Sequence, residues 1–227
     1  MRDLLRTIDP PASVMMPPRP RTRVVMAASD HPRRAEFERF IEARFEQAFG
    51  ARVLRHYPLV TALCAEDGTI LAAAGVRFAE DEPLFLERYL DAPIEQAVAE
   101  AFERPVARGS VVEIGSLASD TPAASLQLFS VLSAWLASER GRRFAVATAR
   151  PDLQRLLGRA GFELRAMGEA DPARLGDGAR DWGSYYDRTP QVFVGEIGRS
   201  AALPLLRRRL RDKTMARAIR RLRTVAP

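Results

Sequence analysis

Cysteine and histidine are scarce in this chain of 227 residues, and their scarcity limits the chemistry that it can perform. The single cysteine, Cys64, excludes an intramolecular disulfide and a cysteine-based zinc site. The two histidines, His31 and His56, form neither an H-x-E nor an H-E-x-x-H pattern. We therefore expect no metal-dependent catalysis.

Long apolar runs are also missing. No segment approaches the ~20 consecutive apolar residues of a membrane-spanning helix. The first 23 residues hold five prolines and lack the apolar core of a signal peptide. With 47% hydrophobic and 28% charged residues, the chain is expected to be a globular cytoplasmic protein, or one that lies peripherally on the inner face of the membrane.

The formal net charge of +6 is unevenly distributed. Residues 199–227 contain nine arginines and Lys213 against one acidic residue, Asp212, a local charge of +9, so residues 1–198 carry −3. Apolar residues recur in this tail at spacings of three to five, which predicts a basic amphipathic helix. Such a helix contacts an anionic membrane or an acidic partner, or it packs on the domain with its arginines in solvent. The tail has no aromatic residues and the body is acidic, which argues against nucleic-acid binding.

The hydropathy pattern predicts a mixed α/β domain over residues 21–198, preceded by a disordered, proline-rich lead over 1–20. Asp30 and Gly50 are the expected caps of a first helix, and Asp67-Gly68 predicts a hairpin turn. Strand–helix–strand units in the second half predict parallel neighbours there. The expected strands are 21–28, 59–65, 69–78, 111–118, 144–148, one starting at Phe162, and 191–197. The expected later helices are 83–90, 93–102, 122–139 and 152–160, with a loop at 171–184.

Several segments resemble known families. Leu153–Leu164 (L-Q-R-L-L-G-R-A-G-F-E-L) resembles the late motif of GNAT acyltransferases, in which a short amphipathic helix precedes a strand. Glu82–Gln96, Val112–Ser119, Asp181–Val192 and the run Ala72–Arg77 resemble the thermostable haemolysin family.

This resemblance spans about residues 21–198. It implies a GNAT-like fold similar to the acyl-homoserine-lactone synthases, with a mixed central sheet flanked by helices. It also implies transfer of a fatty acyl group from a thioester to an amine. A fatty-acylated product that lyses cells would reconcile the family name with an enzyme.

Glu113 is the candidate general base. It lies in an apolar strand (V-V-E-I), where burial would raise its pKa toward neutrality. It also matches the glutamate of the E-x-x-R pattern of the lactone synthases. Ser116 stands where that pattern has arginine, which puts lactone synthesis itself in doubt. The alternative is a water-facing carboxylate on an edge strand.

Arg77 matches the arginine of a lactone-synthase G-x-x-R segment. It would pair with Glu113 or with a substrate carboxylate. The alternative is a solvent-exposed arginine at the end of its strand. Glu87, flanked by apolar residues, either reaches the site or is a charge on a helix surface. Trp182, Tyr185 and Tyr186 either line an acyl or amine pocket, with Tyr185 as the acid that protonates the leaving thiolate, or cap the core.

Thr121 and Ala123 lie at the start of the helix that corresponds to the one holding the CoA pyrophosphate in most GNAT proteins. The resemblance therefore makes them the candidate donor-binding residues. The surrounding stretch, Ser119–Ser125, lacks the glycines of that motif, and Asp120 would oppose a phosphate. This favours an acyl-carrier-protein thioester over acyl-CoA as donor, with the acidic carrier meeting the arginines of the tail.

The sequence thus predicts an N-acyltransferase for a small amine acceptor, with no metal. Its alternatives are a membrane-active haemolysin that acts through its tail and a non-catalytic lipid-binding relative.

Overall fold

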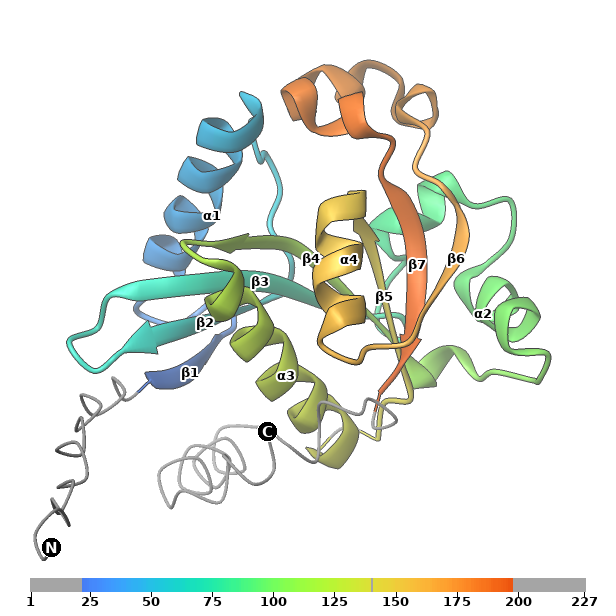
Figure 1. Ribbon diagram of the computed structural model, residues 1–227, viewed down its shortest axis with the longest axis horizontal. Coiled ribbons are helices and arrows are strands. Elements are labelled where there is room, and N and C mark those ends of the chain that lie inside the picture. Colours follow the sequence, from blue (N-terminus) through green and yellow to red (C-terminus); the bar gives the residue numbers. More distant parts are fainter. Residues whose placement is uncertain (1–21, 140, 198–227) are drawn as a thin grey trace, which may run out of the picture.

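A computed structural model describes residues 22–139 and 141–197, and the lead over 1–20 and the tail over 199–227 lie outside the described residues. A central sheet flanked by helices forms the domain, as expected (Figure 1). Its strands are β1 (Thr22–Ala27), β2 (Leu59–Ala65), β3 (Ile70–Phe78), β4 (Val111–Ser119), β5 (Phe144–Ala149), β6 (Leu164–Glu169) and β7 (Gln191–Glu196). The α-helices are α1 (Arg34–Phe49), α2 (Ile94–Phe102), α3 (Pro122–Glu139) and α4 (Pro151–Arg159). The 3₁₀ segments are η1 (Phe85–Tyr89), η2 (Arg108–Ser110) and η3 (Pro172–Arg188).

The strands lie in the order β1-β2-β3-β4-β5-β7-β6. The β2–β3 hairpin is antiparallel, as its Asp-Gly turn predicts. The prediction of parallel neighbours in the second half holds for β4 and β5 but is wrong for β5 and β6. The connection through α4 places β6 one position beyond the neighbour of β5 in the sheet. β7 lies between β5 and β6 and is antiparallel to both.

Different helices cover the two faces of the sheet. Successive residues of a strand point to opposite faces, so neighbouring residues of β3 pack against different helices. Ala72 and Ala74 of β3 pack in the apolar cluster around Leu128 of α3. Ala73, between them, packs in the cluster around Ile41 of α1. Figure 1 shows α3 crossing in front of the sheet.

A third apolar cluster joins η1 and α2 to the far half of the sheet, with Leu86 and Ile94 against Val146 and Val194. Within the described ranges, no helix is long and apolar enough to cross a membrane.

Three local predictions differ from the structure. Asp30 does not cap α1, because His31 precedes Pro32 and a residue before proline avoids the helical region, so the helix begins at Arg34. β6 begins at Leu164 rather than Phe162, after the turn at Gly161. The stretch expected as a loop, within η3, forms short 3₁₀ turns that are interrupted at Gly176 and Gly183, where the backbone is not helical.

Candidate active site

The parallel strands β4 and β5 separate after three residue pairs. Their pairing runs from Val111 opposite Phe144 to Glu113 opposite Val146 and then ends. Beyond this point a cleft of about 480 Å³ opens. The outer edges of the two strands pair with β3 and β7, so the inner edges turn their backbone N–H and C=O groups toward the cleft. Its lining includes Ile114–Leu117 of β4, Ala147–Ala149 of β5, the first turns of α3 and α4, and the rings of Phe45, Phe49 and Tyr185.

β4 is irregular where it borders the cleft. The register with β3 passes from Ala73 opposite Ala118 to Gly75 opposite Gly115, which leaves Ser116 and Leu117 as the bulged residues. Ser116 adopts a positive φ of 49°. A bulge bends its strand and redirects its side chains and backbone groups. It therefore bends β4 at the lining of the cleft.

Arginine dominates the mouth of the cleft. Arg155 and Arg159 of α4 line the cleft and are exposed, so they mark its mouth, and Arg150 lines it just before that helix. Asp120 and Asp152 are the acidic residues of the lining. Asp120 forms an ion pair with Arg44 of α1, and Asp152 pairs with Arg150 at 2.9 Å. Asp120, which was expected to oppose a phosphate group, therefore has a cationic partner. The remaining arginines make the mouth of the cleft suited to an anionic ligand.

Of the two predicted donor-binding residues, Thr121 lines the cleft and Ala123 does not. The Thr121 Oγ1 accepts the N–H of Ala124 at 3.2 Å, and the Thr121 carbonyl accepts the N–H groups of Ala124 and Ser125. Pro122 has no N–H group. Of the N–H groups in this first turn, only that of Ala123 is not hydrogen-bonded to Thr121. The start of α3 therefore offers few free donors for a pyrophosphate.

Glu113 is buried on a central strand, with 2% of its surface exposed, so the alternative of a water-facing edge carboxylate is wrong. Its Oε2 accepts the N–H of Phe85 at 2.8 Å, and its Oε1 accepts the N–H of Leu86 at 3.2 Å and the hydroxyl of Tyr57 at 3.1 Å. Burial raises the pKa of Glu113 to about 7, against the opposing effects of these bonds and of the Arg77 charge. The carboxyl group is thus able to exchange a proton near neutral pH, but it does not itself line the cleft.

Arg77 lies opposite Glu113 in the register of β3 and β4. Its guanidinium pairs with Glu82 at 3.0 Å and lies 5.0 Å from the centre of the Tyr57 ring. Arg77 thus adds positive charge near the buried carboxylate of Glu113, but it forms its ion pair with Glu82.

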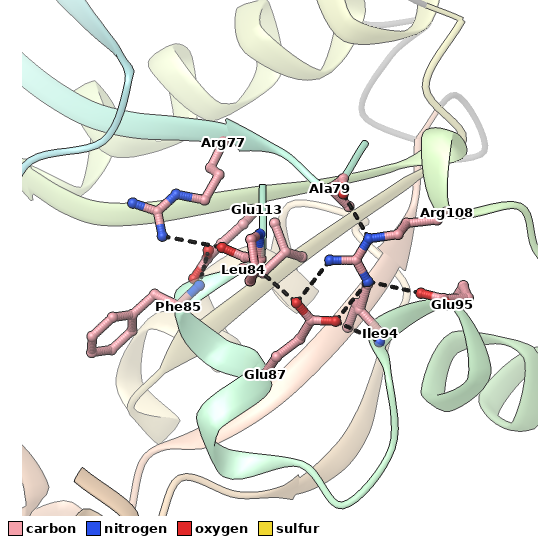
Figure 2. Close-up of polar contacts among 10 residues, drawn as sticks. Arg77, Ala79, Leu84, Phe85, Glu87, Ile94, Glu95, Arg108 and Glu113 are labelled. Atoms are coloured by element: carbon pink, nitrogen blue, oxygen red, sulfur yellow. Dashed lines mark hydrogen bonds and ion pairs between the residues drawn. The ribbon is translucent and has the colours of Figure 1, made fainter. Parts of the chain in front are cut away.

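Glu87 does not line the cleft. Figure 2 shows it bound to Arg108, which donates to both of its oxygens at 2.7 and 2.9 Å. The N–H groups of Leu84 and Ile94 also donate to it. Although burial opposes the change, these bonds hold the pKa of Glu87 below its usual range. The side chain therefore holds η1 in place beside Glu113 rather than reaching into the cleft.

The predicted aromatic cluster exists, and one of its members lines the cleft. Tyr185 does so, and its hydroxyl donates to the Thr148 carbonyl at 3.2 Å. Burial raises the pKa of Tyr185, so its phenol is protonated at neutral pH. Trp182 and Tyr186 pack behind it without lining the cleft, and Tyr186 shares a short hydrogen bond with Tyr89 of η1.

Sequence reasoning missed Tyr57 and the arginines of the cleft mouth. Gly75 and Gly115, inside strands, were the available signal for Tyr57, because a glycine in a strand marks a close approach. Arg155 and Arg159, four residues apart on α4, were identifiable as neighbours on one helix face.

Solved structures with this architecture include acyl-homoserine lactone synthases. The AHL synthase LasI superposes with a TM-score of 0.55 at 9% sequence identity, covering 79% of this chain and 91% of LasI. The CoA-dependent acyl-homoserine lactone synthases BjaI and MesI give TM-scores of 0.53 and 0.51 at 14% and 16% identity. BjaI is matched over 87% of this chain and 98% of its own, and MesI over 82% and 94%. At these identities the likeness establishes the fold, which is GNAT-like.

No curated protein matches the chain. The profile of the family described as thermostable hemolysin matches residues 27–201, most of the chain and almost all of its described part. The chain therefore belongs to the thermostable hemolysin family.

Proposed function

We propose that this protein is an N-acyltransferase that moves a fatty acyl group from a thioester to a small amine. The observation that carries the proposal is the cleft between β4 and β5, where two parallel strands separate and turn backbone groups toward a space of about 480 Å³. An extended pantetheine arm, which carries amide groups, can pair with such edges as an added strand does. Backbone N–H groups of the same edges are suitable donors for the oxyanion that forms when an amine attacks a thioester.

A carrier-protein thioester is the donor that the cleft favours. Acyl-CoA brings a pyrophosphate, and the start of α3 has two of its first N–H groups capped by Thr121. A carrier protein brings one phosphodiester and an acidic surface, which Arg155 and Arg159 at the cleft mouth and the basic tail can both meet.

Glu113 is the proposed base, and Tyr185 is the proposed acid at the thiolate. The raised pKa of Glu113, about 7, allows the carboxylate to accept a proton at physiological pH. Tyr185 places a protonated phenol at the wall of the cleft, within reach of a bound ligand.

The test is thiol release by the purified full chain, given acyl-carrier-protein and acyl-CoA donors of several chain lengths and a panel of primary amines. Products are identified by mass spectrometry. We expect an N-acyl amide with at least one donor, and faster turnover with the carrier protein. Glu113→Gln should abolish turnover while leaving donor binding intact.

A pair of bulky substitutions ties the activity to the cleft. Leu156→Trp adds a large ring at the lining, and Leu54→Trp adds the same ring at an exposed position outside it. Only the first should lower turnover, by at least tenfold. Equal rates in the two variants, or no thiol release by folded wild-type protein with any donor, would refute the proposed function.

A further inference from the structure

The segment η1 supplies two of the hydrogen bonds that the buried Glu113 carboxylate accepts. The N–H groups of Phe85 and Leu86 donate to its two oxygens at 2.8 and 3.2 Å. Leu86 also packs in the third apolar cluster. Apolar contact is non-directional, whereas a hydrogen bond weakens steeply when its donor tilts away from the acceptor. The orientation of η1 therefore decides how well these two donors serve Glu113.

Arg108 fixes this orientation through Glu87 (Figure 2). The Glu87 carboxylate accepts the N–H of Leu84 at 2.7 Å, at the start of η1, and the N–H of Ile94 at 2.9 Å, at the start of α2. Two guanidinium nitrogens of Arg108 donate to the same carboxylate at 2.7 and 2.9 Å. A bidentate pair of this kind constrains direction as well as distance. Glu87 thus holds both ends of the η1 connection, and Arg108 holds Glu87.

Arg108 is itself anchored to the sheet. It lies in η2, directly before β4, the strand that carries Glu113. Its Nε donates to the Ala79 carbonyl at 2.7 Å, just past the end of β3, and one of its terminal nitrogens also donates to Glu95 at 2.9 Å. The η1 donors and the carboxylate that accepts from them are therefore both tied to β4.

We propose that Arg108 is a positioning residue for the reaction, which keeps the two N–H groups of η1 on the Glu113 carboxylate by holding Glu87. This inference rests on the proposed function, in which Glu113 is the base. When the contact between Arg108 and Glu87 is lost, η1 is free to tilt. Glu113 then loses donors that favour its charged form, so the base becomes harder to ionise.

Three other charged or titratable groups face Glu113. They are Arg77 from β3, Tyr57 from the segment between α1 and β2, and Tyr89 from η1. Of these, only Tyr89 belongs to η1 and would move with it. Burial raises the pKa of Tyr89, so its phenol is uncharged at neutral pH. The two N–H donors therefore carry the effect of an η1 displacement on Glu113.

Arg108→Gln is the first test, made in the full chain. The pKa of Glu113, followed by carbon-13 NMR of the carboxyl group that is absent from Glu113→Gln, should rise by about one pH unit. The acid limb of kcat/KM, which reports the base of the free enzyme, should move to higher pH by the same amount. At pH 7 kcat/KM should thus fall about fivefold and recover at pH 9, where the base is ionised again. Arg108→Lys, which keeps the charge but not the fork of donors, should restore part of the loss.

Glu87→Ala separates positioning from charge. Loss of the Glu87 charge would by itself lower the pKa of Glu113, whereas release of η1 would raise it. A rise in both Arg108→Gln and Glu87→Ala supports positioning. A rise in the first variant with a fall in the second overturns the proposal, because charge alone would explain both results.

Arg104→Gln is the matched control. Arg104 pairs with Glu196 at 2.8 Å, and 34% and 13% of the two side chains are exposed, against 31% and 17% for Arg108 and Glu87. Its loss removes a similar ion pair that does not hold η1, so the pKa of Glu113 should stay unchanged. An equal rise in this variant would overturn the assignment to Arg108.

The NMR measurement needs no substrate, so the failures of the two proposals are distinguishable. A wild-type chain that releases no thiol with any donor removes the proposed function, even where the pKa of Glu113 responds to Arg108. An active wild type whose Glu113 pKa and pH profile are unchanged in Arg108→Gln overturns the positioning role and leaves the transferase standing.

Discussion

At the scale of single residues, opposing effects act on the protonation of Glu113. Burial on a central strand favours its neutral form, and the N–H groups of η1, the charge of Arg77 and the Tyr57 hydroxyl favour its charged form. Burial outweighs them, so the folded chain holds this proton more tightly than an exposed glutamate would.

Glu113 should therefore make stability fall as pH rises. Its folded pKa, about 7, lies above the ordinary value of 4.5, so its contribution is fully present below pH 4.5 and is lost as pH rises to 7. Each pH unit in that window costs up to about 1.4 kcal/mol. Glu113→Gln cannot titrate, so the stability of wild type relative to this variant should decline between those pH values, measured by urea unfolding. A difference independent of pH would contradict the burial argument.

The glycine under Tyr57 offers a second test at this scale. Gly115→Ala would place a methyl group 1.9 Å from the phenol oxygen, which forces the ring to move. We expect a loss of about 1–3 kcal/mol, typical of overpacking. Gly158→Ala in α4 is the matched control, since its methyl group meets nothing within 4 Å and alanine favours helix. Thermal unfolding of both variants decides the matter, and equal midpoints would show that the ring has room.

At the scale of elements, η3 is fastened to the end of α1. The Arg52 N–H donates to the Asp181 carbonyl at 2.6 Å, and the Ser184 hydroxyl donates to the Phe49 carbonyl at 3.3 Å. In Figure 1 the orange η3 segment and α1 lie at the same end of the molecule. This contact places Tyr185 against the rings of Phe45 and Phe49 in the cleft wall.

Gly183 permits that contact. Its φ is +51°, and a Cβ atom there would lie 2.0 Å from the Phe49 oxygen. Gly183→Ala should separate η3 from α1, cost about 1–3 kcal/mol and speed hydrogen exchange at the Arg52 amide. Gly178→Ala, in the same segment with open space around it, should leave that exchange rate unchanged. Slow exchange in both variants would mean that the fastening does not depend on Gly183.

At the scale of the whole molecule, charge is divided between the body and the tail. Residues 1–198 carry −3 and residues 199–227 carry +9. An acidic carrier protein would therefore meet a repulsive body unless local arginines or the tail attract it.

Removing residues 199–227 should raise KM for an acyl carrier protein at least tenfold and leave KM for acyl-CoA little changed. The difference should shrink in high salt, because screening weakens surface attraction. Lysis of red cells by purified protein, measured in parallel, tests the alternative that the tail is a lytic element. If lysis vanishes with the tail in the absence of any acyl donor, the membrane-active role is the correct one for this segment.

Much of the architecture follows from local patterns in the sequence. The β2–β3 hairpin, the helix ending at Gly50 and the strand around Glu113 were predictable, because turn residues and apolar periodicity act over a few neighbours. Local patterns could not place β7 between β5 and β6, since strand order depends on pairings between distant segments.

The candidate site shows the same division. Residue type and an apolar context were enough to predict that Glu113 is buried, and the aromatic cluster was enough to include Tyr185 among the candidates. Tertiary structure alone decided that Glu87 would bind Arg108, that Tyr57 would reach Glu113 across two glycines, and that Tyr185 rather than Trp182 would line the cleft. These outcomes depend on which side chains from separate elements meet in a space of a few ångströms, and packing of the whole chain determines those meetings.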